Sequence, residues 1–266
     1  MVIGWIAAGI ALLSGALSYK AAKDAQRDAK KQQDAMAGVL VNKQSNIEPI
    51  PVIYGERRVG GTRVFVDASG EPKNKYLYIA LVLAEGEVDD IYDIKIDDYS
   101  ILDSKYGAVE RRDELDQSFR IVYSDQTQGT EFGDVVYIEA YKGRDDQAAS
   151  DILQGSTKWT ANHKLSGIAY LAIRLRWKND IFSGIPEITC VVKGKKVYDP
   201  RKDSTSAVYD DTLGVSTHRF GTTSTYEWSD NPSLCIFDYL TNTRYGKGLA
   251  ESDINLSLFA TAAMRS

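Results

Sequence analysis

The chain has 266 residues, of which 43% are hydrophobic and 26% charged, and its formal net charge is −5. This composition is that of an ordinary globular protein and argues against a largely disordered chain. A protein that binds nucleic acid stably usually carries a clear excess of positive charge, so the net charge disfavours that class.

The first 19 residues carry no charged side chain. A membrane-spanning helix needs about 20 apolar residues, so this run is borderline in length. A cleaved signal peptide fits poorly because no Lys or Arg precedes the apolar residues. Ala7, Ala11 and Gly15 recur at every fourth position, which places small side chains on one helical stripe where another helix can approach closely.

Residues 20–36 continue this run without a helix breaker and are rich in Ala, Lys, Asp and Gln. We therefore predict one N-terminal helix over residues 1–36, apolar in its first half and charged in its second. A linker is predicted over residues 37–47 and a β-rich domain over residues 48–266. The predicted fold class is predominantly β, with a long N-terminal helix and short C-terminal helices.

The apolar residues of the β-rich domain recur with a period of two, as is typical of strands. The runs Pro51–Tyr54 and Thr62–Asp67 predict short strands on either side of a basic segment that contains glycine. Residues 75–84 are largely apolar on both faces, so this strand should be central and covered on both sides. A further strand is predicted around residues 91–96, and the polar residues 99–117 predict a loop or an exposed hairpin.

Val135–Tyr141 and Gly167–Trp177 also predict strands. The second alternates apolar and polar side chains and is the clearest half-buried pattern of the chain. Between these two runs, Ser150 or Asp151 is a candidate cap for a short helix.

The predicted end of the β-rich region is a hairpin that turns at Lys193-Gly194-Lys195. Pro200 ends the hairpin, and a polar loop follows as far as Thr225. A helix is then predicted with Asn231 as its cap and Pro232 at its first position. The predicted buried face of this helix consists of Ile236, Phe237 and Leu240. A second helix is predicted to start at Ser252-Asp253 and to run through Leu258.

Few residues of the sequence are candidates for catalysis, metal binding or a disulfide. Cys190 and Cys235 each lie in apolar surroundings and are interpreted as small buried residues, with a disulfide between them left open. His163 and His218 have no Cys or carboxylate at ligand spacing, so a zinc site is not expected.

Charged residues occur in short groups. The acidic pairs are Asp89-Asp90, Asp97-Asp98, Asp145-Asp146 and Asp210-Asp211, and the basic groups are Arg57-Arg58 and Lys193–Lys196. Carboxylates in turns are usually solvated, and basic groups also serve to bind a partner's carboxylates or to keep a chain soluble. We therefore expect no enzyme activity, catalytic residue, metal or cofactor.

Several separated runs together resemble one known family. The first is residues 50–67, IPVIYGERRVGGTRVFVD, and the longest apolar run is YLYIALVLAEGEV within residues 75–98. The others are residues 167–177, the GIPE motif at 184–187 with the run that ends at Arg201, and residues 231–248. In order and spacing, these runs over residues 48–256 resemble the N-terminal hub region of bacteriophage tail tip attachment (host-specificity) proteins, also called baseplate hub proteins.

The resemblance implies a structural role at the distal end of the phage tail in the virion. Such hubs form a trimeric ring of β-barrel-like domains that closes the tail tube and opens for DNA ejection. The implied partners are further copies of the chain, the distal tail protein and the tape-measure protein, with phage DNA passing through. Family members usually continue into receptor-binding modules beyond the length of this sequence, so host attachment is not carried over to it.

Within this role, residues 2–33 are expected to form a continuous helix that packs with its symmetry mates near the tail axis. The stripe of Ala7, Ala11 and Gly15 would face the neighbouring helix, and residues 2–19 are apolar enough to contact the host membrane after triggering. The alternative from another class is a membrane-anchored bacterial envelope protein with an extracytoplasmic β-domain. A third hypothesis, a carbohydrate-degrading tail enzyme, is supported only by the acidic pairs.

Overall fold

The computed structural model describes residues 43–44, 49–70, 74–102, 109–113, 120–125, 135–177, 182, 184–214 and 217–265. The predicted N-terminal helix, with Ala7, Ala11 and Gly15, lies outside these residues. The chain divides into two units, Met1–Val41 and Asn42–Ser266, and the description below concerns the second unit. Of the predicted linker only Lys43–Gln44 is described, and it forms strand β1 rather than a loop.

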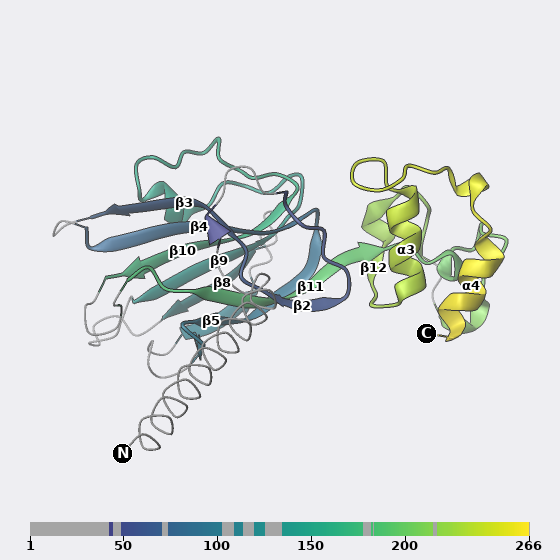
Figure 1. The fold of residues 1–266 in the computed structure, drawn as a ribbon, viewed down its shortest axis with the longest axis horizontal. Helices are drawn as coiled ribbons and strands as arrows, with labels where there is room; N and C mark the ends of the chain where they lie inside the picture. The colour runs from purple at the N-terminus through teal and green to yellow at the C-terminus, as the bar shows by residue number, and fades with distance from the viewer. Residues whose placement is uncertain are drawn as a thin grey trace, which may run out of the picture. The chain divides into compact units, whose positions relative to one another are not determined.

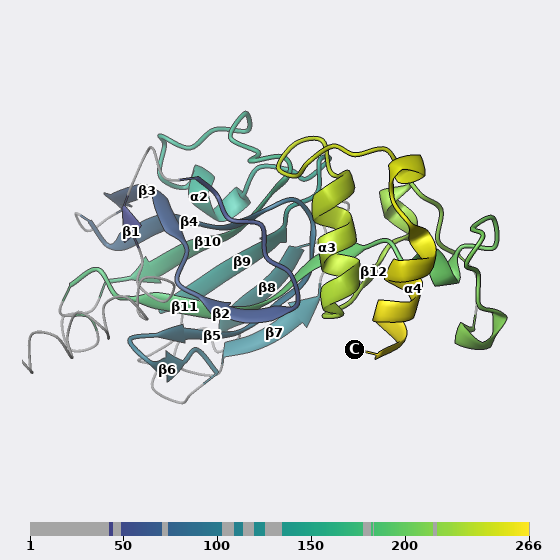
Figure 2. The same ribbon diagram turned by 45° about the vertical axis from the view of Figure 1, so that its right-hand side comes forward.

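The larger of two sheets has seven strands (Figure 1). In spatial order they are β1 (Lys43–Gln44), β3 (Thr62–Ser69), β4 (Tyr76–Glu85), β10 (Ile168–Arg176), β9 (Val136–Lys142), β8 (Arg120–Asp125) and β7 (Val109–Asp113). All neighbours are antiparallel except β1 and β3. Figure 2 shows β4, β10 and β9 in the middle of this sheet and β7 at its edge.

The smaller sheet lies against the larger one. Its path is β12 (Glu227–Trp228), β11 (Ile188–Val197), β5 (Val88–Ile96) and β6 (Tyr99–Ser100), and β2 (Glu56–Val59) also pairs with β11. The main apolar core lies between the sheets, with side chains such as Ile79, Leu81 and Ile173 from one and Ile91 and Val192 from the other. The fold is therefore predominantly β, as predicted.

The prediction of a barrel-like domain is wrong for the described strands. A barrel needs a sheet that closes on itself, whereas β1 and β7 each pair with one neighbour in the large sheet, and β6 and β12 do so in the small sheet. The reason lies in the connections. The chain leaves one sheet for the other at Gly60-Gly61, between β2 and β3, and at Gly86, between β4 and β5. The strands on either side of these two crossings therefore lie in different sheets and do not pair with each other.

Strand β4 is central and buried along almost its whole length, as predicted. Strand β10 is more buried than the prediction of a half-buried strand, because Tyr170 and Ala172 on its polar face are as buried as its apolar face. Arg174 and Arg176 on the same face stay partly exposed, as predicted. A second core covers Tyr170 and Ala172, formed in part by Leu153 of helix α2 (Asp151–Gln154) and by Trp159. Ser150 caps α2, because its hydroxyl accepts a hydrogen bond from the Leu153 amide.

The predicted hairpin at residues 193–195 is also wrong. Strand β11 runs straight through these residues as a single strand of ten residues, and Gly194 is buried within it. Gly194 lies so close to the chain before β2 that a Cβ atom on it would stand 2.1 Å from the Ile53 carbonyl oxygen. Glycine at this position permits close approach of two backbones. This is a common role of glycine within a strand, besides forming a bulge or a bend.

Two predicted segments differ in detail. Pro51–Tyr54 is not a strand, and the strand begins at Glu56 instead. Residues 99–117, predicted as a loop or an exposed hairpin, contain β6 and β7, and β7 pairs antiparallel with β8. The backbone of residues 51–53 still bonds to the sheets, since the carbonyls of Pro51 and Ile53 accept hydrogen bonds from Glu85 and Lys195.

The residues after β11 form short 3-10 helices, η2 (Pro200–Lys202), η3 (Asp211–Leu213), η4 (Thr223–Thr225) and η5 (Glu251–Asp253), and helices α3 (Pro232–Thr241) and α4 (Leu256–Arg265). Asn231 caps α3 and Pro232 is its first residue, as predicted. Ile236 is 52% exposed, contrary to prediction, because α3 turns Leu234, Phe237 and Asp238 inward. The second helix starts at Leu256 instead of Ser252, because residues 251–253 form η5.

Candidate functional site

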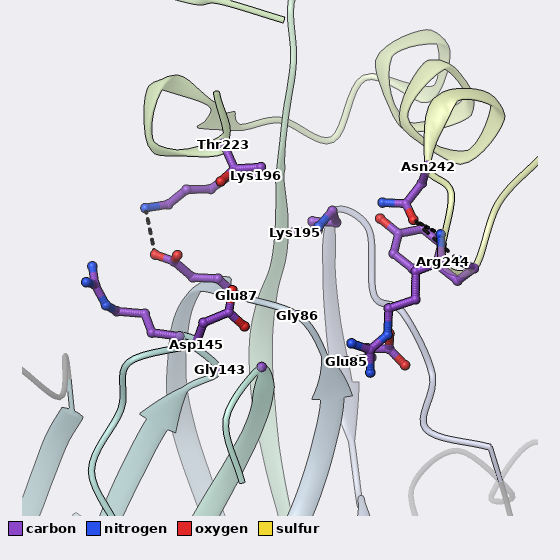
Figure 3. Close-up of a pocket in the computed structure, with 13 residues that line it drawn as sticks. Glu85, Gly86, Glu87, Gly143, Asp145, Lys195, Lys196, Thr223, Asn242 and Arg244 are labelled. Carbon is purple, nitrogen blue, oxygen red and sulfur yellow. Dashed lines mark hydrogen bonds and ion pairs between the residues drawn. The ribbon is translucent and has the colours of Figure 1, made fainter. Parts of the chain in front are cut away.

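A polar cleft of about 200 Å³ lies where the β4–β5 turn meets the residues after β11 (Figure 3). It is lined by Glu85, Gly86, Glu87, Gly143, Arg144, Asp145, Gly167, Lys195, Lys196, Thr223, Asn242, Arg244 and Tyr245. This is where β11 carries the chain from the two sheets to the C-terminal helices. We define the C-terminal segment as residues 199–214 and 217–265.

Three glycines form one wall of the cleft. Gly86, Gly143 and Gly167 have φ values of +84°, +88° and +72°, a region that favours glycine. The Gly86 amide donates to the Gly167 carbonyl at 2.7 Å, and a Cβ atom on Gly143 would stand 2.3 Å from the Gly86 carbonyl oxygen. The three loops therefore pack backbone against backbone, which fixes the corner at which the chain changes sheets.

The charged side chains of the cleft neutralise one another. Arg244 of the C-terminal segment forms an ion pair with Glu85 at the end of β4. Lys196 lies 3.7 Å from Glu87, as Figure 3 shows, and 3.9 Å from Asp89. Because acidic and basic groups alternate around the cleft, it does not have the uniformly positive lining that a phosphate-binding site requires.

A buried carboxylate joins the C-terminal segment to the sheets. Asp238 of α3 accepts hydrogen bonds at 2.5 Å from the hydroxyls of Tyr54 and Tyr245. Burial, with the neighbouring carboxylate, raises the pKa of both phenols, so both remain donors at neutral pH. We call these three residues the tyrosine–aspartate joint. No sequence pattern indicated it, because its members are 184 and 7 residues apart in the chain.

The polar residues after β11 are organised by two buried groups. His218 is 1% exposed, and its Nδ1 accepts a hydrogen bond from the Asp199 amide at 2.9 Å. Burial lowers the pKa of His218. Asp203 accepts hydrogen bonds from Tyr198, Thr205 and Arg219. Both groups hold the backbone of the loop in place, which is a structural role.

The acidic pairs singled out in the sequence have structural partners. Asp97 and Asp98 have positive φ values of 48° and 65° in the turn before β6, and Asp97 accepts a hydrogen bond from the Glu187 amide. Asp210 caps η3. Asp146 pairs with Arg144 through two bonds of 2.7 Å, which lower the pKa of its carboxyl group.

The basic run Lys193–Lys196 lies along β11, and its three lysines face acidic or aromatic groups. Lys193 stands over the ring of Trp228 and Lys195 over that of Tyr245. Among the described residues, no group of three or more His, Cys, Asp or Glu side chains could hold a metal ion. Cys190 and Cys235 are free thiols.

No family model matches the chain, and no curated protein matches it. Among the solved structures that match is a chain from the virion of a native gene transfer agent (GTA) particle. The two are 19% identical with a TM-score of 0.37, over 75% of this chain and 38% of that chain. This chain therefore spans well under half of that neighbour's length, and so low a TM-score assigns neither fold nor function.

The helices of the described region, α2 to α4 and the 3-10 turns, are all too short or too polar to cross a bilayer. The apolar residues 1–19 lie outside this region.

Proposed function

We propose that the protein is a structural component of the distal end of a phage tail, a tail tip or baseplate hub protein. In this role it closes the tail tube in the virion and forms part of the channel for DNA ejection. The proposal extends to a homotrimer that contacts the distal tail protein and the tape-measure protein, and to the absence of enzyme activity.

One observation carries this proposal. The separated runs that resemble the hub region are neighbours in the fold. Residues 62–67, 76–85 and 168–176 lie in β3, β4 and β10, three adjacent strands of the large sheet. The runs that contain β2, β5 and β11 likewise adjoin one another in the small sheet. Similar segments that assemble into one contiguous piece support a shared module more strongly than the same segments scattered over a surface would.

The polar groups of the described residues support a scaffold role. Gln147, for example, is fully buried, and its amide bonds the carbonyls of Lys164, Leu165 and Ile168 while its oxygen accepts from the Gly143 amide. A side chain used in this way fastens a loop to the sheet and has no capacity left for chemistry. A subunit that must hold its shape under the load of an assembled tail benefits from such cross-links.

The deciding experiment locates the protein. A phage lysate is separated into purified virions and bacterial membranes, and each fraction is probed with an antibody against residues 49–265. We expect the protein to purify with virions in a fixed ratio to the tail proteins and to be labelled at the distal tail end in electron micrographs. Recovery from membranes, with none in washed virions, would contradict the proposal and favour the membrane-anchored envelope protein.

A further inference from the structure

The C-terminal segment has an aromatic core of its own. The Phe237 ring of α3 contacts Phe220 at 6.0 Å and Phe259 at 5.5 Å between ring centroids. It also contacts Tyr198, the residue just before the segment, at 5.8 Å. The buried core between the sheets ends, in chain order, at Val192. Within the unit Asn42–Ser266, the sheets and the C-terminal segment are thus two bodies, each packed around its own interior.

Strand β11 passes from one body to the other at the cleft. Its last pair with β5 joins Lys195 to Val88, and its first pair with β12 joins Lys196 to Trp228. Strand β12 belongs to the C-terminal segment. The strand therefore changes partners between two consecutive residues, both of which line the cleft. Rotation of the backbone between them turns the C-terminal segment without breaking either ladder.

The contacts that bridge the two bodies are mainly polar. They include the Tyr54–Asp238 hydrogen bond of the tyrosine–aspartate joint, the ion pair between Arg244 and Glu85, and a 3.4 Å hydrogen bond from the Trp228 indole to the Gly55 carbonyl. Lys193 and Lys195 of β11 also stand over the rings of Trp228 and Tyr245. The apolar contribution is a small cluster of Val197, Leu234 and Ala263 with Tyr54. The Arg244–Glu85 pair lies near solvent, with the Arg244 side chain 74% exposed, so it exchanges for bonds to water at little net cost. The more buried Tyr54–Asp238 hydrogen bond is therefore the stronger part of the connection.

We propose that the C-terminal segment is a hinged lid on the cleft. The hinge lies at Lys195-Lys196, and the latch consists of the tyrosine–aspartate joint and the Arg244–Glu85 pair. Opening breaks the latch, widens the cleft and presents the Glu85 carboxylate to a partner. This inference is independent of the proposed role in a phage tail.

The test is a distance measurement across the cleft in the full-length chain. Spin labels are placed on two exposed alanines, one on each body, with the variants Ala161→Cys and Ala207→Cys in a Cys235→Ser background. The latch variants are Tyr54→Phe with Arg244→Gln and, separately, Asp238→Asn. The matched control is Arg144→Gln, which removes a positive charge from the same cleft but whose partner Asp146 lies on the same loop.

We expect the latch variants to raise the population of the longer inter-label distance at least threefold and the control to leave it unchanged. Amide exchange of β4 and β10, measured on the same samples, should stay at the level of the parent. The hinge is disproved if both latch variants keep the parent's distance distribution. It is also disproved if exchange in β4 and β10 accelerates with the distance change, because the two bodies would then unfold as one.

Discussion

At the scale of single residues, the fold depends on positions where a side chain would not fit. Gly194 and Gly143 bring backbones together at distances that exclude a Cβ atom. At Gly184, by contrast, no atom of the described residues other than its chain neighbours lies within 4 Å of the place where a Cβ would stand. The structural role of a glycine therefore depends on the atoms packed around it.

We predict that Gly194→Ala lowers the free energy of unfolding by at least about 2 kcal/mol, because its methyl group would overlap the Ile53 carbonyl and force β11 away from the preceding chain. Gly184→Ala serves as the control and should change stability by less than about 0.5 kcal/mol. Urea unfolding of both variants measures the difference. Equal stability of the two would show that the chain beside Gly194 adjusts freely.

We predict that His218 makes stability depend on pH. Burial lowers the pKa of His218 in the folded state, so the unfolded chain binds the proton more tightly. The contribution of His218 to the free energy of unfolding is fully present above the unfolded pKa of about 6.5. It is lost as pH falls below that value, by at most about 1.4 kcal/mol per pH unit. Protonation would also remove Nδ1 as acceptor for the Asp199 amide.

The measurement compares unfolding free energies of the parent and His218→Asn between pH 7.5 and 5, in about half-unit steps. Asn keeps an acceptor on a short side chain but does not titrate, so its curve should be flatter than that of the parent over this range. Parallel curves would mean that other groups, such as the nearby Glu227, account for the pH dependence.

At the scale of elements, the residue that caps one helix can also bind a neighbouring helix. The Asn231 oxygen accepts hydrogen bonds from the Ser233 and Leu234 amides at the start of α3. Its amide nitrogen donates to the Ala263 carbonyl of α4 at 2.9 Å. One side chain therefore starts one helix and holds the end of another.

We predict that Asn231→Ala costs roughly 2 kcal/mol, about half from the lost cap and half from the lost bond to α4. Asn231→Asp keeps the cap but cannot donate to Ala263, so it should cost roughly half as much. Thermal unfolding of the two variants separates these contributions. Identical losses would assign the whole effect to the contact between the helices.

The N-terminal stripe gives a further prediction at this scale. Ala11→Leu with Gly15→Leu places bulky side chains where close helix packing is proposed, so particle assembly and DNA ejection should fall at least tenfold, as counted by plaque assays and electron microscopy. Ala8→Leu, one position off the stripe, is the control and should assemble normally. Normal assembly of the double variant, or a map that places this segment on the outer wall of the hub, would contradict packing at the axis.

At the scale of the whole molecule, the proposed role requires a symmetric ring, since a closed tail end is built from identical copies around one axis. Exposed apolar side chains such as Leu258, 68% exposed, and Met264, 61% exposed, occur on α4. We predict a homotrimer, measured as the native mass of the protein released from purified tails. A monomer in that preparation would contradict both the trimer and the ring.

Part of the local structure could be predicted from the sequence. Alternating apolar residues located β3, β4, β5, β9 and β10, because a strand with a buried face has a period of two whatever its partners are. Asn231-Pro232 located the start of α3, since capping is a property of adjacent residues.

The tertiary structure alone decided what depends on distant neighbours. Gly194 is typical of a turn in isolation, but its place beside Ile53 makes it part of a continuous strand. Tyr170 alternates with apolar residues as an exposed side chain would, yet α2 and Trp159 cover it. The cleft and the tyrosine–aspartate joint combine residues far apart in the chain. No local sequence pattern predicts these contacts, because they depend on which strands pair with each other.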